Sequence, residues 1–229
     1  NEKSEIIKQA KLNAENELKR LASKNTAVSE QLDILADMLG CNESIETIGM
    51  FDVSNTQGTN PVASMVVANR EGIQLSKYRK FAIKVKDTPD DYAMMYEALH
   101  RRYKRIKITD ELNLPSVVMV DGGKGHLSVL SQVFKDLGLL DSGVKLCAIA
   151  KGEYRDKGLE TIYCDEFEEP LPIEFNSPLI FLMQNIRDES HRTAIGYHRK
   201  LRSKAMVKSV LDEIPGLGAS KKKSLLSQF

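Results

Sequence analysis

The sequence lacks the features that mark membrane, secreted and zinc-binding proteins. None of its apolar runs approaches the length of a membrane-spanning helix, and no signal peptide is visible. The three cysteines, Cys41, Cys147 and Cys164, are far apart and odd in number. They form neither a zinc pattern nor a disulfide framework, which favours a reducing, cytoplasmic compartment. Because long apolar runs are missing, we expect no membrane partner. The chain begins at Asn1 rather than Met, so we expect a piece of a longer protein.

The chain also has little net charge, but its charges are unevenly distributed. The 33 Lys and Arg residues against 32 Asp and Glu leave a formal charge of +1. Residues 187–223 hold 10 basic and 4 acidic side chains, a local charge of +6, so the remainder is near −5. A basic end indicates an anionic partner such as nucleic acid. A solvated, charge-rich surface helix is the alternative.

Hydrophobic periodicity predicts an α/β fold. An antiparallel meander of strands is followed by alternating β and α units, which indicates a mixed sheet with antiparallel and parallel strands, flanked by helices. The predicted helices cover 1–24, 29–39, 90–105, 125–137 and 177–206, the predicted strands 46–54, 61–69, 73–85, 117–121 and 145–150, and a polar hairpin or loop 161–175.

The C-terminal segment differs in kind. A short helix over 209–214 precedes the string Pro-Gly-Leu-Gly at 215–218, and a further helix begins at Ala219. Gly216 and Gly218 can expose backbone N–H groups at a helix N-terminus, where phosphate binds, and Lys221 and Lys222 add charge. A tight hairpin between two packing helices is the alternative.

Two aspartates and a histidine are the strongest candidates for a catalytic site. Asp121 ends the apolar run Val-Val-Met-Val, a strand buried on both faces, at the sheet edge where α/β folds bind ligands. Asp52 lies between Phe51 and Val53 within a strand, so it points to the face opposite theirs. His191 lies in the long helix.

These residue types together suit a hard cation. Carboxylates on neighbouring strands bind Mg²⁺ or Mn²⁺, and such a site supports hydrolysis of a phosphodiester. His191 is a further ligand or a general acid/base. The alternatives are a salt bridge between Asp52 and Arg79 and a structural His191. The glycines after Asp121 lack P-loop spacing and are expected to give clearance for a DNA backbone.

Several long motifs carry a resemblance to a known family. They are, in order, FDVSNTQGTNPVASMVV, YRKFAIK, DDYAMMYEALHRRY, VVMVDGGKGHL, IAKG, RDESHRTAIGYHRK and SVLDEIPGLG. Together they resemble the C-terminal half of the UvrC family, the incision subunit of bacterial nucleotide excision repair. The resemblance covers about residues 45–229 and implies an RNase H-like endonuclease domain at 45–206 and an incomplete helix-hairpin-helix DNA-binding element at 207–229. The lysine- and glutamate-rich start of the chain predicts an N-terminal helical connector at 1–44.

The resemblance also implies a mechanism and partners. The domain would make the 5′ incision in damaged double-stranded DNA as part of the UvrABC system, with Mg²⁺ or Mn²⁺ and the triad Asp52, Asp121 and His191. UvrB would dock through a segment outside this sequence, and UvrA would act indirectly. A catalytically idle DNA-binding or scaffold module is the alternative, and an enzyme that cuts RNA in hybrids is a third.

Further residues are expected to bind DNA or to support the site. The predicted DNA-binding residues are Lys124, Arg187, Arg192, Arg199, Arg202, Gly216, Gly218, Lys221 and Lys222. Tyr78 and Arg79 are expected to position phosphate or orient ligands, and Glu97 to supply a further carboxylate. For Glu97, an ion pair with Arg101 four residues along the helix is the alternative.

Overall fold

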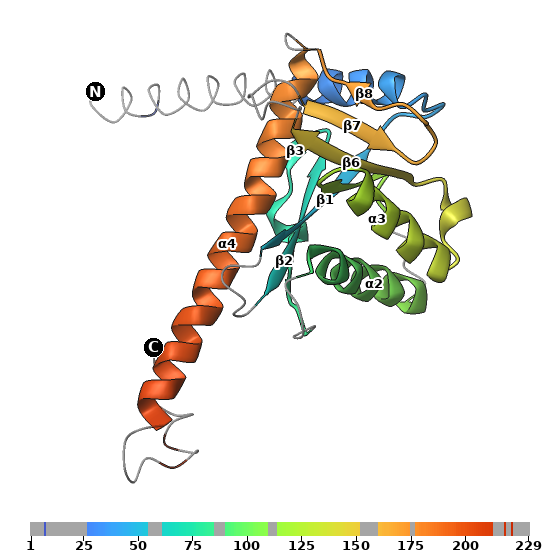
Figure 1. The fold of residues 1–229 in the computed structure, drawn as a ribbon. Coiled ribbons are helices and arrows are strands. Elements are labelled where there is room, and N and C mark those ends of the chain that lie inside the picture. Colours follow the sequence, from blue (N-terminus) through green and yellow to red (C-terminus); the bar gives the residue numbers. More distant parts are fainter. Residues whose placement is uncertain are drawn as a thin grey trace.

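The computed structural model describes residues 7, 27–54, 61–84, 90–109, 114–151, 160–174, 177–212, 218 and 221, with backbone alone for 107–109, 151 and 204–212. Within these ranges the strands form one sheet in the order β3-β2-β1-β5-β6-β7-β8, with β4 also paired to β2 (Figure 1). The strands are β1 (Thr47–Ser54), β2 (Val62–Asn69), β3 (Gly72–Ile73), β4 (Arg79–Ala82), β5 (Val117–Asp121), β6 (Lys145–Lys151), β7 (Glu160–Cys164) and β8 (Leu171–Pro172).

The sheet is mixed, as the sequence predicts. β1 pairs antiparallel with β2, whereas β1 with β5 and β5 with β6 are parallel. β7 returns antiparallel to β6, and β8 pairs with β7, so the polar segment after residue 160 is a hairpin. The helices are α2 (Asp91–Thr109), α3 (Lys124–Asp136) and α4 (Pro178–Asp212), with short 3₁₀ helices η1 (Leu75–Lys77) and η2 (Leu140–Ser142).

The prediction of one strand over 73–85 is wrong. The chain forms β3, then η1, then β4, and both strands pair with β2 at different places along it. The 3₁₀ turn η1 causes the interruption, because the backbone N–H of Lys77 donates to the carbonyl of Gln74 at 3.0 Å instead of to a neighbouring strand. The Oδ1 atom of Asn69 holds the preceding turn between β2 and β3. It accepts from the backbone N–H of Glu71 at 2.9 Å and from Nε2 of Gln74 at 2.8 Å.

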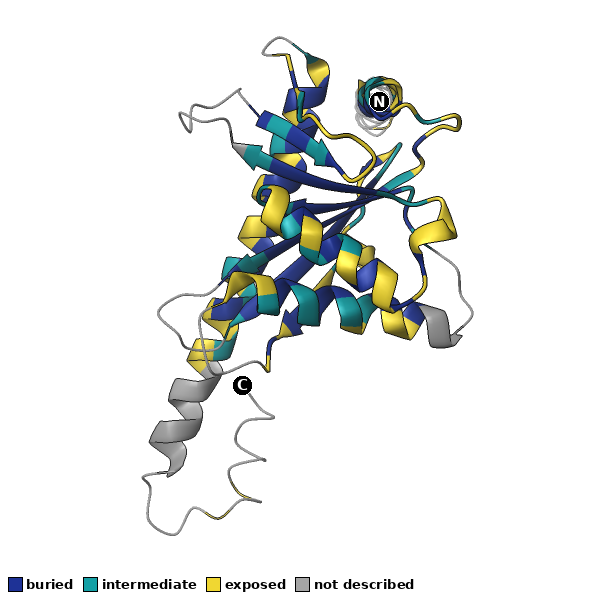
Figure 2. Cartoon of the chain, turned by 45° about the vertical axis from the view of Figure 1, so that its right-hand side comes forward, coloured by how far each residue is buried: buried dark blue, intermediate teal, exposed yellow. Residues whose placement is uncertain are grey.

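Two apolar clusters lie on opposite faces of the sheet, because successive strand residues point to opposite sides. Met50 joins the cluster beneath α4, and Phe51 joins the cluster beneath α2 and α3. Figure 2 shows the central strands buried between helices whose outer surfaces are exposed. Each helix therefore faces one side of β1, and the direction of a β1 side chain decides which helix it meets.

The helix over residues 27–38 belongs to this packed core. Leu32, Leu35 and Leu39 are fully buried in the cluster beneath α4. The predicted connector at 1–44 therefore contains a helix that packs on the sheet, while residues 1–24 lie outside the described part apart from Ile7.

The long helix α4 extends further than predicted. It continues to Asp212 and passes beyond the sheet, so the expected break before a separate helix at 209–214 is absent up to that residue (Figure 1). No described helix is both long enough and apolar enough to cross a membrane.

Candidate active site

Asp52 and Asp121 lie beside each other at one end of the sheet. β1 and β5 are parallel, and Phe51 is the register partner of Val120. Asp52 and Asp121 each follow one member of that pair, so both carboxylates come from the carboxyl ends of neighbouring strands. This is the edge at which open α/β sheets bind ligands.

The helix α4 brings His191 to the same place. Asp52 is the register partner of Ser64 on β2, and the hydroxyl of Ser64 donates to the backbone carbonyl of Ser190 at 2.8 Å. This buried bond ties α4 to the sheet one residue before His191. The Nδ1 atom of His191 lies 3.1 Å from Oδ2 of Asp52, across 139 residues of sequence.

Asp52 therefore faces α4, as the alternation with Phe51 and Val53 predicts. Its side chain is 8% exposed, whereas that of His191 is 60% exposed. The alternative partner, Arg79, instead donates to the backbone carbonyls of Tyr78 at 2.7 Å and Ser76 at 3.4 Å. The site thus combines a buried carboxylate with an imidazole that solvent and substrate can reach.

The electrostatics of the site favour a positive charge. Burial, and to a lesser extent the nearby Asp121 carboxylate, raises the pKa of Asp52 from 3.8 to about 6. The contact with His191 opposes both effects. A buried carboxylate next to a second one is costly to ionise, and a cation held between them would remove that cost.

The chemistry of these donors fits a hard cation. Carboxylate oxygens with room for water are what Mg²⁺ and Mn²⁺ prefer. Among the described residues, however, no three His, Cys, Asp or Glu side chains converge as a metal-binding group. The Asp52–Asp121 pair fits the ion, while the Nδ1 atom of His191 is already in contact with Asp52.

The glycines after Asp121 have a local explanation that differs from the predicted clearance for DNA. Gly122 adopts φ +142°, and a Cβ there would lie 2.2 Å from Nδ1 of His126. A Cβ on Gly125 would lie 2.5 Å from the hydroxyl of Tyr92. Tyr92 and His126 themselves contact each other, with ring centroids 4.8 Å apart. Only Gly123 in this group opens onto free space.

Glu97 and Tyr78, predicted as supporting residues, and Lys124, predicted to bind DNA, each contact a residue outside the Asp52–Asp121–His191 group. Glu97 forms the ion pair with Arg101 at 2.9 Å and accepts from the backbone N–H of Lys84. The hydroxyl of Tyr78 is buried near Glu189, and burial chiefly raises its pKa. Lys124 is exposed at the start of α3, with its ammonium 5.9 Å from the ring centre of Tyr163.

The basic face of α4 is smaller than predicted. Arg187 is 6% exposed and forms an ion pair with Glu160 of β7 at 3.2 Å, so it is not part of an exposed cationic surface. Arg192, Arg199 and Arg202 are exposed, and Arg192 also bonds Glu189. Of the C-terminal residues, Gly218 and Lys221 are described and exposed, while Gly216 and Lys222 lie outside the described part.

The sequence did not predict the contacts of Ser64, Ser190 and His126. Ser64 and Ser190 position His191, but a serine in a strand or helix carries no signal of such a bond. His126 had no expected partner, although its spacing of four residues from Gly122 at a helix start could have suggested the contact. Arg102 lies within the motif DDYAMMYEALHRRY, but nothing in that motif predicted a role for it.

Comparison with known proteins assigns the family. A family model described as the UvrC RNase H endonuclease domain matches residues 36–195. The chain belongs to the UvrC family. It is similar to UvrABC system protein C of Protochlamydia amoebophila, with 44% identity over 100% of this chain and 37% of that protein. The protein of the same name from Methylobacillus flagellatus is 41% identical over 97% of this chain and 37% of that protein.

The chain thus spans about a third of the length of its UvrC relatives. Its mixed sheet and flanking helices are the RNase H-like fold that this family model describes. Among solved structures, the catalytic domain of human endonuclease V aligns with 15% identity and a TM-score of 0.41, over 84% of this chain and 98% of that one.

Proposed function

We propose that this domain is a divalent-metal-dependent DNA endonuclease that makes the 5′ incision in bacterial nucleotide excision repair. One observation carries the proposal. Asp52, its neighbour Asp121 and the exposed His191 meet at the carboxyl ends of two parallel strands in a UvrC-family domain. An acidic pair beside an accessible imidazole suits hydrolysis of a phosphodiester.

Asp52 and Asp121 would hold Mg²⁺ or Mn²⁺. Bound there, the ion would supply positive charge to activate water and to stabilise the leaving oxygen of the phosphodiester. The burial of Asp52 gives its carboxylate a fixed direction, because the core beneath α4 surrounds it. Asp121 is less buried and lies at the strand end, where a DNA backbone can approach.

His191 would act as a general acid/base rather than as a metal ligand. Its Nδ1 atom contacts Asp52, and the ionised carboxylate accepts a hydrogen bond from an Nδ1–H tautomer. The Nε2 atom is then the basic nitrogen, and the ring is 60% exposed. A carboxylate that orients an imidazole in this way sets which nitrogen accepts the proton.

The substrate would be damaged double-stranded DNA. Arg192, Arg199, Arg202, Lys124 and Lys221 are exposed cations that can contact phosphates without reading sequence. UvrB would recruit the protein, UvrA would act indirectly, and the reaction would take place in the cytoplasm. The relatives' name, UvrABC system protein C, supports these partners. Gly216, Gly218 and Lys222 would add phosphate contacts in the incomplete helix-hairpin-helix element.

The test is incision of an end-labelled, lesion-bearing duplex by full-length UvrC carrying this domain, together with UvrA, UvrB and Mn²⁺. Labels at either end separate the 5′ cut from the 3′ cut. Asp52→Ala is expected to lower 5′ incision by at least about 100-fold and to leave the 3′ cut in place. Asp141→Asn, which changes an exposed carboxylate on η2, is the control and should cut as wild type does.

Undiminished 5′ incision by Asp52→Ala would overturn the proposed site. Absence of metal-dependent 5′ incision by both the wild type and Asp52→Ala, with the 3′ cut in place, would favour the idle scaffold. Cutting of an RNA–DNA hybrid in preference to the duplex would favour the third reading.

A further inference from the structure

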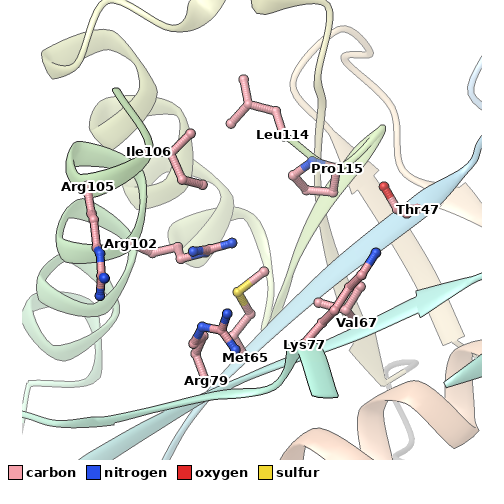
Figure 3. A pocket seen from close by; sticks show the side chains of 10 residues that line it. All are labelled: Thr47, Met65, Val67, Lys77, Arg79, Arg102, Arg105, Ile106, Leu114 and Pro115. Atoms are coloured by element: carbon pink, nitrogen blue, oxygen red, sulfur yellow. The ribbon is translucent and has the colours of Figure 1, made fainter. Parts of the chain in front are cut away.

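A second polar site lies on the opposite face of the sheet. A cavity of about 510 Å³ opens between α2, the start of β1 and the β3–β4 connection. Four basic residues line it: Lys77 from η1, Arg79 from β4, and Arg102 and Arg105 from α2. Figure 3 shows the guanidinium of Arg102 projecting from α2 into the space between the helix and the sheet.

Every ionisable side chain among the described residues that line this cavity is basic. The Nε atom of Arg102 is buried without a hydrogen-bond partner. Burial lowers the pKa of Arg102, and the cations of Arg79 and Arg105 lower it further. Like charges in a half-enclosed space repel, and an anion with several negative charges would relieve the repulsion.

Apart from Thr47, the rest of the lining is apolar. Met65 and Val67 of β2 form the floor, and Ile106, Leu114 and Pro115 form a wall. A cavity of this volume accommodates a small molecule, and apolar walls with a few convergent polar groups are typical of ligand sites. Arginine guanidinium groups bind phosphate through paired N–H donors, and they also stack on aromatic rings. A phosphate that carries a flat ring therefore satisfies both parts of the lining.

We propose that this cavity binds a phosphate-bearing nucleotide, through Lys77, Arg79, Arg102 and Arg105 on the phosphate and the apolar wall on the base. The nucleotide is either one residue of a DNA strand or a free nucleotide.

The site is separate from the acidic centre. Thr47, which lines the cavity, and Asp52 are five residues apart on β1, about 17 Å along the strand. Asp52 faces α4, whereas Met65 and Val67 belong to the cluster beneath α2. Binding at the cavity therefore needs neither the metal nor the chemistry proposed above.

The experiment measures arginine accessibility in metal-free buffer with a chelator. Phenylglyoxal modifies exposed guanidinium groups, and mass spectrometry of peptides reports each arginine separately. The wild-type chain is treated alone, with inorganic phosphate, with dAMP, or with a short single-stranded oligonucleotide. Ligand is expected to protect Arg102 and Arg105 and to leave Arg101, which pairs with Glu97, unchanged.

A variant pair gives an independent readout. Arg102→Gln should weaken ligand affinity, measured by fluorescence anisotropy, by about tenfold or more, because a charge-assisted bond to phosphate is lost. Lys104→Gln changes the same charge on an exposed position of the same helix and should bind as wild type does. The wild-type protection data stand whether or not the variant folds.

The ligand arms distinguish the two sources. Protection by the oligonucleotide but not by dAMP assigns the cavity to a DNA strand, and protection by dAMP that also competes with the oligonucleotide assigns it to a free nucleotide. The proposal is overturned if no ligand protects Arg102, or if Arg102→Gln and Lys104→Gln bind equally. Because no metal is present and no cut is made, this failure is distinguishable from failure of the incision proposal.

Discussion

The acidic centre and the basic cavity lie at opposite ends and on opposite faces of the same strands. Asp52, near the end of β1, and Asp121, at the end of β5, lie on the side of α4, while Thr47 and Pro115 lie where those strands begin, on the side of α2. One site concentrates negative charge and the other concentrates positive charge. The nearly neutral net charge of the chain conceals this separation.

The two sites differ in the signs of the charges that surround them. At the acidic centre, His191 bonds the buried carboxylate and partly offsets the repulsion from Asp121. In the basic cavity no described lining residue carries a negative charge. The proposals above assign chemistry on a phosphodiester to the first site and retention of a phosphate to the second. Substitutions at the two sites and on α4 test this difference.

The largest effect is expected for His191→Asn. Loss of a general acid/base lowers a rate by about 10²–10⁴-fold. The reconstituted incision reaction should slow by this amount, and the pH–rate profile should lose the limb that depends on the imidazole. His100→Asn is the control, because His100 stacks on Tyr96 of α2, outside the site. Equal rates and profiles for the two variants would exclude a proton-transfer role for His191.

The next effect concerns Arg187, whose charge is structural. Replacement by Ala leaves Glu160 buried with its charge uncompensated, so the free energy of unfolding should fall by about 3–5 kcal/mol. Arg199→Ala, at an exposed position of the same helix, should change it by less than about 0.5 kcal/mol. Urea unfolding of the chain measures both. If both variants change the free energy of unfolding only slightly and Arg187→Ala binds DNA more weakly, Arg187 belongs to the DNA-binding surface after all.

The third prediction tests the pKa of Asp52 in metal-free buffer. The folded carboxyl titrates near 6 and the unfolded one near 3.8, so the folded state binds more protons between these values and stability falls as pH rises through that window. Above it, Asp52→Asn should be more stable than wild type by up to about 3 kcal/mol. Below about pH 4 the difference should vanish. Thermal unfolding across this range measures the gap, and a gap independent of pH would contradict the assignment.

The smallest effect is expected for the exposed cations of α4. Arg199→Gln should weaken duplex binding by a few-fold and reduce the slope of log affinity against log salt by about 1. Fluorescence anisotropy over a salt series measures this slope. An unchanged slope would place the DNA away from this part of α4.

The sequence predicted the acidic centre better than the basic cavity. Val117–Val120 and the residues around Asp52 show the apolar runs of buried strands. The sequence therefore predicted where these strands lie and which face Asp52 points to. The cavity draws its lining from β1, β2, β4, α2 and the segment before β5, and no sequence spacing joins those positions.

The sequence also did not predict the partners of individual side chains. Helical spacing placed Arg187 with the exposed arginines, but its partner Glu160 comes from β7, 27 residues away. The interruption of the third predicted strand is a single 3₁₀ turn at Leu75–Lys77, in a segment whose residues do not differ in kind from those of the flanking strands. For Arg187 a tertiary contact overrode a local pattern.

The proposed mechanism requires the Asp52–Asp121 pair to hold a divalent cation. Calorimetric titration of Mn²⁺ into the metal-free chain measures this binding. Asp52→Asn and Asp121→Asn are compared with the Asp141→Asn control at a pH above the Asp52 titration. Binding by the wild type and the control, lost in both site variants, is the predicted result. Absence of binding in the wild type, or equal binding by Asp52→Asn, would contradict the account.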